Sequence, residues 1–188
     1  MMRTKDDRKL QSIKQAVLKL ILAEGFQGAS IAKIAREAGV SPATVYIYYE
    51  NKDAMLVDIY RDYREAIDAY LLRRLDDDMD GPQVIETLVY SYYDYIVTHN
   101  EQFYFVEQFS SCPALSKSCG HSPGSSPLYW WLDRLKQRRI IKNFDNDIIS
   151  AMIFYPVKGL AVRYQSSAEE AAPRLADLIQ MIEDALLR

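Results

Sequence analysis

The sequence of 188 residues has few residues that break helices, with seven glycines and seven prolines, and its composition suits long helices. It has two cysteines, Cys112 and Cys119, too few for the disulfide framework of a small secreted domain. No run of about 18 uncharged apolar residues occurs, so no membrane-spanning helix is predicted. The charged N-terminus lacks the apolar stretch of a signal peptide, and we therefore expect a cytoplasmic protein.

The net charge of −3 argues by itself against a nucleic-acid binder, but the charges are unevenly distributed. Residues 1–52 contain nine basic and five acidic residues, a net charge of +4. The remaining residues contain 14 basic and 21 acidic residues, a net charge of −7. This asymmetry is typical of a protein that meets phosphates with one end, and the alternative is ordinary scatter of surface charge.

Apolar residues recur at spacings of three and four, which predicts an all-α chain of about nine helices. A first helix over residues 5–24 is expected to end at Gly25, a residue suited to a left-handed C-cap. Ser30 and Ser41 are placed to cap two short helices, and Asn51 is placed to cap a fourth. Five further helices are expected over residues 83–98, 101–111, 128–139, 145–166 and 168–187.

Residues 30–52, with the sequence SIAKIAREAGVSPATVYIYYENK, are the most informative segment. They predict two short helices with a tight turn at Gly39, the arrangement that presents a second helix to the major groove of DNA. Ser41, Ala43 and Thr44 are small enough to let that helix sit deep in the groove. The side chains placed to reach the sugar–phosphate backbone are those of Tyr46, Tyr48 and Lys52.

Residues 10–60 resemble the N-terminal domain of the TetR family of bacterial transcriptional regulators. The matching residues are Gly25-Phe26, Ser30-Ile31-Ala32-Lys33-Ile34-Ala35, Ala38-Gly39-Val40-Ser41, Thr44-Val45-Tyr46, Tyr48-Tyr49, Asn51-Lys52 and Leu56. Many family members have glycine in place of Ala43 and phenylalanine in place of Tyr49.

The resemblance implies roles for eight residues in DNA binding. Tyr46 and Lys52 clamp phosphates, and Ser30 contacts a phosphate at the start of its helix. The residues implied to face the bases are Ser41, Ala43, Thr44 and Tyr48. Lys33 is the eighth residue of the DNA-binding set. The helix that Ser41 caps, which we call the reading helix, has no Arg or Lys for a bidentate guanine contact. Base preference therefore rests on Thr44, tyrosine contacts and DNA shape.

The resemblance also implies the domain organisation and the mode of action. Residues 1–52 form the DNA-binding domain, with the helix–turn–helix at about 30–50 and a linking helix at 52–78. Residues 53–188 form a ligand-binding and dimerisation domain, which pairs into a homodimer through the last two helices. A repressor of this kind leaves a palindromic operator when a small aromatic or lipophilic molecule binds.

Aromatic residues are dense over positions 90–109, and they suit a pocket for a flat or lipophilic molecule. The predicted ligand-binding residues are Tyr63, Ile67, Tyr92, Ile96, Phe105, Phe109, Trp131 and Tyr155. The alternative is that most of these aromatic residues form core and dimer surface. Asp94 and Glu107 lie among them and favour a cationic ligand in a further hypothesis.

Other classes of function find little support in the sequence. Cys112, Cys119 and His121 are three candidate metal ligands without a nearby fourth, so we predict no metal, and a redox role stays open. No catalytic motif is evident, and we predict neither an enzyme nor a cofactor. A helical adaptor that does not bind DNA is a remaining alternative. Effector, operator and the choice between repression and activation stay open.

Overall fold

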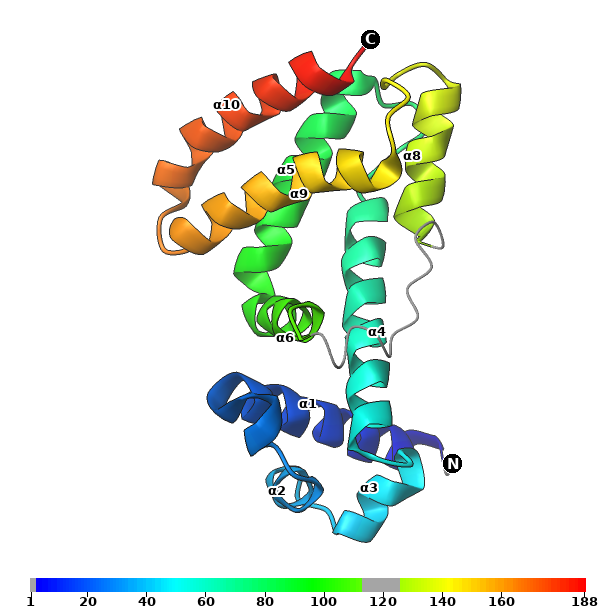
Figure 1. The fold of residues 1–188 in the computed structure, drawn as a ribbon, viewed down its shortest axis with the longest axis vertical. Coiled ribbons are helices and arrows are strands. Elements are labelled where there is room, and N and C mark those ends of the chain that lie inside the picture. The colour runs from blue at the N-terminus through cyan, green and yellow to red at the C-terminus, as the bar shows by residue number, and fades with distance from the viewer. Residues whose placement is uncertain (1–2, 113–125) are drawn as a thin grey trace. The chain divides into compact units, whose positions relative to one another are not determined.

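The computed structural model describes residues 3–112 and 126–188, and within these ranges it contains nine helices and no strand (Figure 1). One isolated antiparallel bridge joins Ile141 and Leu187. The all-α prediction is therefore confirmed for the described residues. None of the helices among them is long and apolar enough to cross a membrane.

The chain divides into two compact units, and helix α4 (Lys52–Leu72) contributes to both. The first unit comprises the described residues of Met1–Arg64 and Glu101–Gly120, and the second those of Glu65–Asn100 and His121–Arg188. Besides α4, the first unit contains α1 (Arg3–Gly28), α2 (Ile31–Glu37), α3 (Pro42–Tyr48) and α6 (Asn100–Ser110). The second contains α5 (Gly81–Thr98), α8 (Pro127–Gln137), α9 (Asn146–Arg163) and α10 (Ala168–Leu186). A domain boundary at residue 52 remains a prediction.

Two glycines shape the first unit because they adopt backbone angles that other residues rarely reach. Gly25 has φ 70° and ψ 178° and interrupts α1, where the sequence predicted the end of the first helix. Gly39 has φ 68° and forms the turn between α2 and α3. The fully buried side chains of Ile34 and Val45 then pack α2 and α3 into the core of this unit.

Polar caps begin the short helices where the sequence predicted them. Ser30 Oγ accepts a hydrogen bond from the backbone N–H of Lys33 at the start of α2. Asn51 Oδ1 likewise accepts from the N–H of Ala54 at the start of α4, over 2.8 Å. Each cap satisfies a donor that the first turn of a helix leaves unpaired.

Helix α4 ends at Leu72, six residues before the predicted end of the linking helix at 78. The sequence explains the earlier end, because residues 76–78 are three consecutive aspartates. Negative charges oppose the partial negative charge at a helix C-terminus. The next helix begins at Gly81, where the Asp80 side chain and Gln83 form a reciprocal capping box.

The second unit is built around α5, which packs against both α9 and α10 (Figure 1). Its core consists of apolar side chains at helical spacing from the three helices, including Ile85, Leu88, Ile149, Ile153 and Leu175. Apolar residues at positions three and four apart on one helix share a face, so burial follows the pattern in the sequence.

Candidate nucleic-acid interface

Helix α3 is short, and local hydrogen bonds fix its first turn. Ser41 caps the helix, with its Oγ accepting from the backbone N–H of Thr44 over 3.2 Å. The same Oγ lies 2.9 Å from Thr44 Oγ1, so the two hydroxyls share a hydrogen bond. Pro42 follows the cap, where its missing N–H leaves no helical bond unmade.

Helix α3 has one buried side and one side that is exposed to solvent. Val45 is fully buried and anchors the helix. Ser41 and Ala43 are exposed, and Thr44 and Tyr48 are half-buried. Tyr46 is 56% exposed, so its hydroxyl is free to approach a phosphate at the edge of a groove. The residues predicted to face DNA on this helix therefore reach the surface of the first unit.

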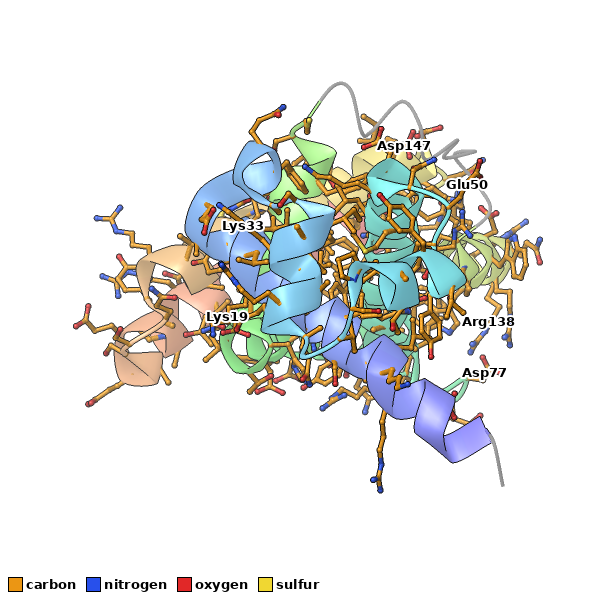
Figure 2. All side chains as sticks on the ribbon, turned by 90° about the horizontal axis from the view of Figure 1, so that it is seen from below. Lys19, Lys33, Glu50, Asp77, Arg138 and Asp147 are labelled. Atoms are coloured by element: carbon orange, nitrogen blue, oxygen red, sulfur yellow. The ribbon has the colours of Figure 1, made fainter. Side chains whose placement is uncertain are left out.

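Two lysines predicted to contact DNA already have partners within the first unit. Lys33 Nζ forms an ion pair of 2.5 Å with Glu24. Figure 2 labels Lys33 among the side chains. Lys52 Nζ donates a hydrogen bond to the backbone carbonyl of Phe26. A lysine ammonium has three donors, so each retains donors for a phosphate. The two side chains are thereby held close to the helices that carry the motif.

A polar network that no local sequence pattern predicts joins the end of α3 to α4 and α1. Lys14 is buried on α1, and its Nζ contacts Asp62 and lies 3.5 Å from Asp58 Oδ2 on α4. The Tyr49 hydroxyl, directly after α3, donates to Asp58 Oδ2 over 3.2 Å. Burial of the Tyr49 phenol, aided by the charge of Asp58, raises its pKa well above the ordinary value. The network ties the end of α3 to α4.

Three residues predicted to bind a ligand lie together in the first unit. Tyr63 meets Phe105 edge-on at a centroid distance of 5.7 Å, and Phe109 neighbours Phe105 at 6.3 Å. Phe26 contacts both phenylalanines edge-on, at 6.2 and 6.0 Å. Burial, followed by the charges of Asp62 and Glu101, raises the pKa of Tyr63 to about 12. In this unit the predicted residues form an aromatic cluster between α1, α4 and α6.

The other five predicted ligand-binding residues lie in the second unit. Ile67 and Ile96 are buried, and so is Tyr92, whose ring meets Phe154 edge-on at 4.8 Å. Trp131 is half-buried, whereas Tyr155 is 67% exposed on α9. Buried aromatic rings in contact are what a packed core requires, so a ligand role for these residues stays a prediction.

The remaining candidate ligands of the sequence do not form a metal site in the described chain. Cys112 is half-buried, and Cys119 and His121 lie outside the described residues. No group of three metal-ligating side chains occurs within residues 3–112 and 126–188. Asp94, a candidate for binding a cationic ligand, is exposed and accepts a hydrogen bond from the Tyr70 hydroxyl. Its carboxylate lies 3.8 Å from the Arg74 guanidinium, so a cation of the chain already lies next to it.

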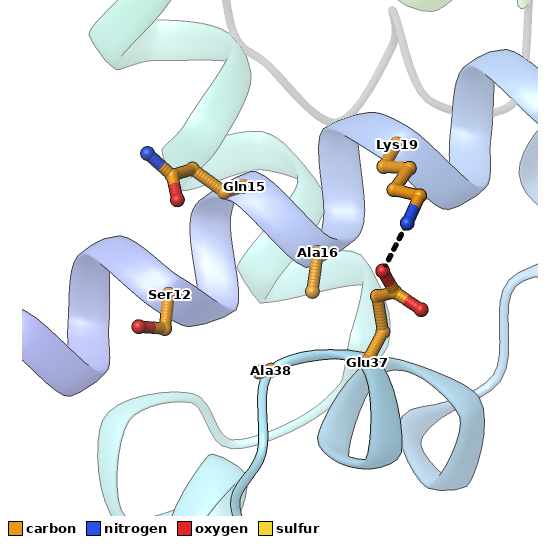
Figure 3. A pocket seen from close by; sticks show the side chains of 6 residues that line it. All are labelled: Ser12, Gln15, Ala16, Lys19, Glu37 and Ala38. Carbon is orange, nitrogen blue, oxygen red and sulfur yellow. Dashed lines mark hydrogen bonds and ion pairs between the residues drawn. The ribbon is translucent and has the colours of Figure 1, made fainter.

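A hollow of about 270 Å³ lies between α1 and the end of α2 (Figure 3). It is lined by Ser12, Gln15, Ala16, Lys19, Glu37 and Ala38. An ion pair of 2.5 Å between Lys19 and Glu37 crosses it. This lining is mainly polar and contains none of the predicted ligand-binding residues, so it does not resemble a lipophilic site.

The two short helices, their glycine turn and the exposed side of α3 define the chain as a helix–turn–helix protein. Residues 13–59 match the sequence model of the bacterial regulatory proteins of the tetR family. The match covers a quarter of the chain, so residues 13–59 are similar to this family of regulators.

Curated relatives match over part of the chain. A fatty acid metabolism regulator protein of Bacillus subtilis is 32% identical over 54 residues, covering 29% of this chain and 28% of the relative. The transposon Tn10 TetC protein of Escherichia coli is 28% identical over 98 residues, covering 52% and 49%. The chain thus spans about half the length of these relatives or less.

Solved structures match over nearly the whole chain. The crystal structure of a TetR family transcription regulator from Marinobacter aquaeolei has a TM-score of 0.80 and 24% identity, covering 98% of both chains. At this identity the likeness establishes the fold, and the all-α architecture with an N-terminal helix–turn–helix is the fold of that regulator.

Proposed function

We propose that this protein is a DNA-binding transcriptional regulator that acts as a ligand-responsive repressor. The single observation that carries the proposal is the exposed face of α3, held by Val45 and Gly39 in a helix–turn–helix. A helix presented in this way fits the major groove of B-DNA. Such a protein works where the bacterial chromosome lies, in the cytoplasm.

Phosphate contacts supply the affinity in this proposal. Tyr46, Lys52 and Ser30 lie in the motif, in a segment whose net charge is +4. Contacts to phosphate release counterions, so the affinity should fall steeply as salt rises. Lys33 joins these contacts from α2, on the helix that precedes the turn.

An exposed apolar stripe on α9 supports pairing of two chains through the last two helices. Its members are spaced by three and four residues and are Ile148, Met152, Tyr155, Gly159 and Val162. The four side chains among them are 39% to 67% exposed in the single chain. A twofold homodimer buries such a stripe against its own copy and gives the two reading helices needed for a palindromic operator.

The proposed effector is a small aromatic or lipophilic molecule bound by the C-terminal part of the chain. Its abundant aromatic side chains supply stacking and apolar contact. One relative is by name a fatty acid metabolism regulator, which makes fatty acids the first lipophilic compounds to test. The effector releases DNA by preferring a conformation in which the reading helices no longer match the operator.

An electrophoretic shift with DNA from the promoter region of the protein's own gene tests the DNA-binding proposal. We expect a complex that dissociates as salt rises from 50 to 200 mM, as phosphate contacts require. Absent or salt-insensitive binding would instead indicate a helical adaptor. Transcription measured from that promoter in the presence and absence of the protein distinguishes a repressor from an activator.

Native mass spectrometry of the purified protein tests the effector proposal. We expect a bound small molecule that survives purification, or one acquired from a panel of aromatic compounds and fatty acids. The same compound should release the DNA complex. A compound that binds without changing the affinity for DNA would contradict its role as an effector.

A further inference from the structure

Ile47 is the most exposed large apolar side chain within the described residues, at 79%. It lies near the C-terminal end of α3, between Tyr46 and Tyr48. An isoleucine in such a place gains nothing for the stability of the single chain, since its apolar surface remains in water. Ile47 is not among the residues that the sequence pattern predicts to face DNA.

The helical period places Ile47 at the outermost ridge of α3. Each residue turns the helix by about 100°, so the directions of residues 43 and 47 differ by about 40°. Together they straddle the direction opposite Val45, the buried anchor of the helix. Ala43 is also exposed, and Thr44 and Tyr46 lie on the two flanks. The part of the helix that enters a groove first is therefore apolar.

The chemistry of α3 excludes the strong base contacts of other reading helices. Pro42–Tyr48 contains no Arg, Lys, Asn, Gln, Asp or Glu, the residues that form bidentate or charged contacts with base edges. The Thr44 hydroxyl is already engaged with Ser41 Oγ. The apolar group that the major groove offers is the 5-methyl group of thymine.

We infer that Ile47, with Ala43 beside it, reads the 5-methyl groups of thymines in the operator. This inference rests on the proposed function, because it requires α3 to lie in the major groove. The occupant of the ridge is duplex DNA, because residues 1–52 have a net charge of +4 that complements the phosphates. Each half-site then contains at least one A·T pair, specified by the methyl group, beneath Ile47.

Replacement of thymine by deoxyuracil tests this inference, since it removes the methyl group and keeps the base pair. A duplex that the full-length protein enriches from a randomised pool provides the reference site. Uracil is then placed at each thymine in turn, and the dissociation constant is measured. We expect one or two positions per half-site to weaken binding about fourfold, the value of one apolar carbon removed from contact.

Variants of Ile47 assign the effect to this side chain. Ile47→Ala should weaken binding to the thymine duplex and make the protein indifferent to uracil at the sensitive position that Ile47 reads, while a position read by Ala43 keeps its effect. Ile47→Val keeps a branched apolar side chain and should retain most of the uracil effect, which makes it the matched control. Circular dichroism should show both variants folded, because the substituted side chain is exposed.

The outcomes separate the inference from the proposed function. Equal affinity of the wild-type protein for thymine and uracil duplexes at every position would overturn methyl reading while leaving DNA binding intact. A uracil effect that persists unchanged in Ile47→Ala would overturn the assignment to Ile47. Failure to enrich any sequence, together with absent salt-dependent binding, would overturn the proposed function and the inference with it.

Discussion

The Tyr49 hydroxyl adds a hydrogen bond at a position where many members of the family have phenylalanine. It donates to Asp58 Oδ2 on α4, directly after the reading helix ends. The ring itself is buried, so phenylalanine would fill the same space. Tyr49 therefore fixes the end of α3 in two ways, by its buried ring and by the hydrogen bond of its hydroxyl to α4.

Tyr49→Phe should lower the free energy of unfolding by about 1 kcal/mol near pH 8, the loss of a hydrogen bond to a partly exposed carboxylate. Urea denaturation followed by circular dichroism measures this difference. Tyr46→Phe, at an exposed tyrosine of the same helix, is the control and should change the stability by less than about 0.5 kcal/mol.

The same pair of proteins should differ in alkaline solution. Burial raises the pKa of Tyr49 above the ordinary 10.0, so the unfolded chain loses this proton first. The free energy of unfolding of the wild-type protein should therefore fall as the pH rises above about 10. Tyr49→Phe lacks this titration, so the difference in stability between the two proteins should shrink there. A constant difference from pH 8 to pH 11 would contradict the assignment. Tyr63, with a pKa raised to about 12, titrates in both proteins.

Lys52→Ala should weaken binding to all DNA sequences alike and reduce the salt slope by about one unit, because one phosphate contact is lost. Titration of a labelled duplex at several salt concentrations measures the slope. Arg73→Ala removes an exposed cation of the second unit and is the matched control. An unchanged salt slope in Lys52→Ala would contradict a phosphate contact of Lys52. Its hydrogen bond to the Phe26 carbonyl would then be its structural role.

Single residues differ in how well the sequence predicts them. Ser30 and Asn51 were predictable as caps, because a cap depends on the residues that follow it within one turn. The Lys14–Asp58 pair spans 44 positions of the chain, and no local pattern specifies it. Ile47 lies within the motif but was not predicted, and its helical phase relative to the buried Val45 is the signal that could have identified it.

At the scale of helices, ion pairs of Lys14 with Asp58 and Asp62 link α1 to α4. The lysine is buried, whereas the side chains of Asp58 and Asp62 are 44% exposed. The two aspartates are four positions apart on α4, where like charges repel unless a cation lies between them. The lysine therefore offsets one of the two negative charges on this part of α4.

Lys14→Met should lower the free energy of unfolding by roughly 1–2 kcal/mol, because two neighbouring carboxylates lose their cation while retaining partial access to water. The double variant Lys14→Met with Asp62→Asn should recover part of the loss, since one of the two charges is removed. Thermal unfolding of the single and double variants measures both effects. Lys9→Met, at an exposed lysine of α1, is the control, and an equal loss there would contradict the network.

The helices were predictable to within a few residues because apolar spacing and caps are local properties of the sequence. The end of α4 was the exception, at Leu72 instead of 78. The aspartates at 76–78 predict a helix end among themselves, but their negative charges oppose the helix dipole, so the helix ends before it includes them. Helix ends without a glycine or proline nearby are the least determined by local pattern.

At the scale of the whole molecule, the stripe on α9 predicts the state of association. Tyr155→Glu places a charge at the centre of this stripe and should convert a homodimer to monomers in sedimentation velocity. Trp130→Glu, at a 62% exposed aromatic side chain of α8, is the matched control and should leave the dimer intact. Retention of the dimer by Tyr155→Glu would contradict pairing through α9.

The sequence predicted the fold of the whole chain better than its ligand site. An aromatic side chain that packs in a core and one that lines a pocket obey the same spacing rules, so Phe105 and Phe109 are equally consistent with both roles. The structure assigns the eight predicted residues to two units, which no periodicity reveals. The helix–turn–helix was predictable because its caps, turn and anchors lie within 23 consecutive residues, 30–52.

The partners of Lys33 and Lys52 have a consequence for the choice between DNA and free anions. A single phosphate ion contacts only the donors that Glu24 or the Phe26 carbonyl leaves free on one lysine, so it gains few contacts. A duplex presents a row of phosphates that engage several side chains at once, so its contacts act multivalently. Inorganic phosphate and mononucleotides at millimolar concentration should therefore be poor competitors of the proposed duplex DNA in a binding titration.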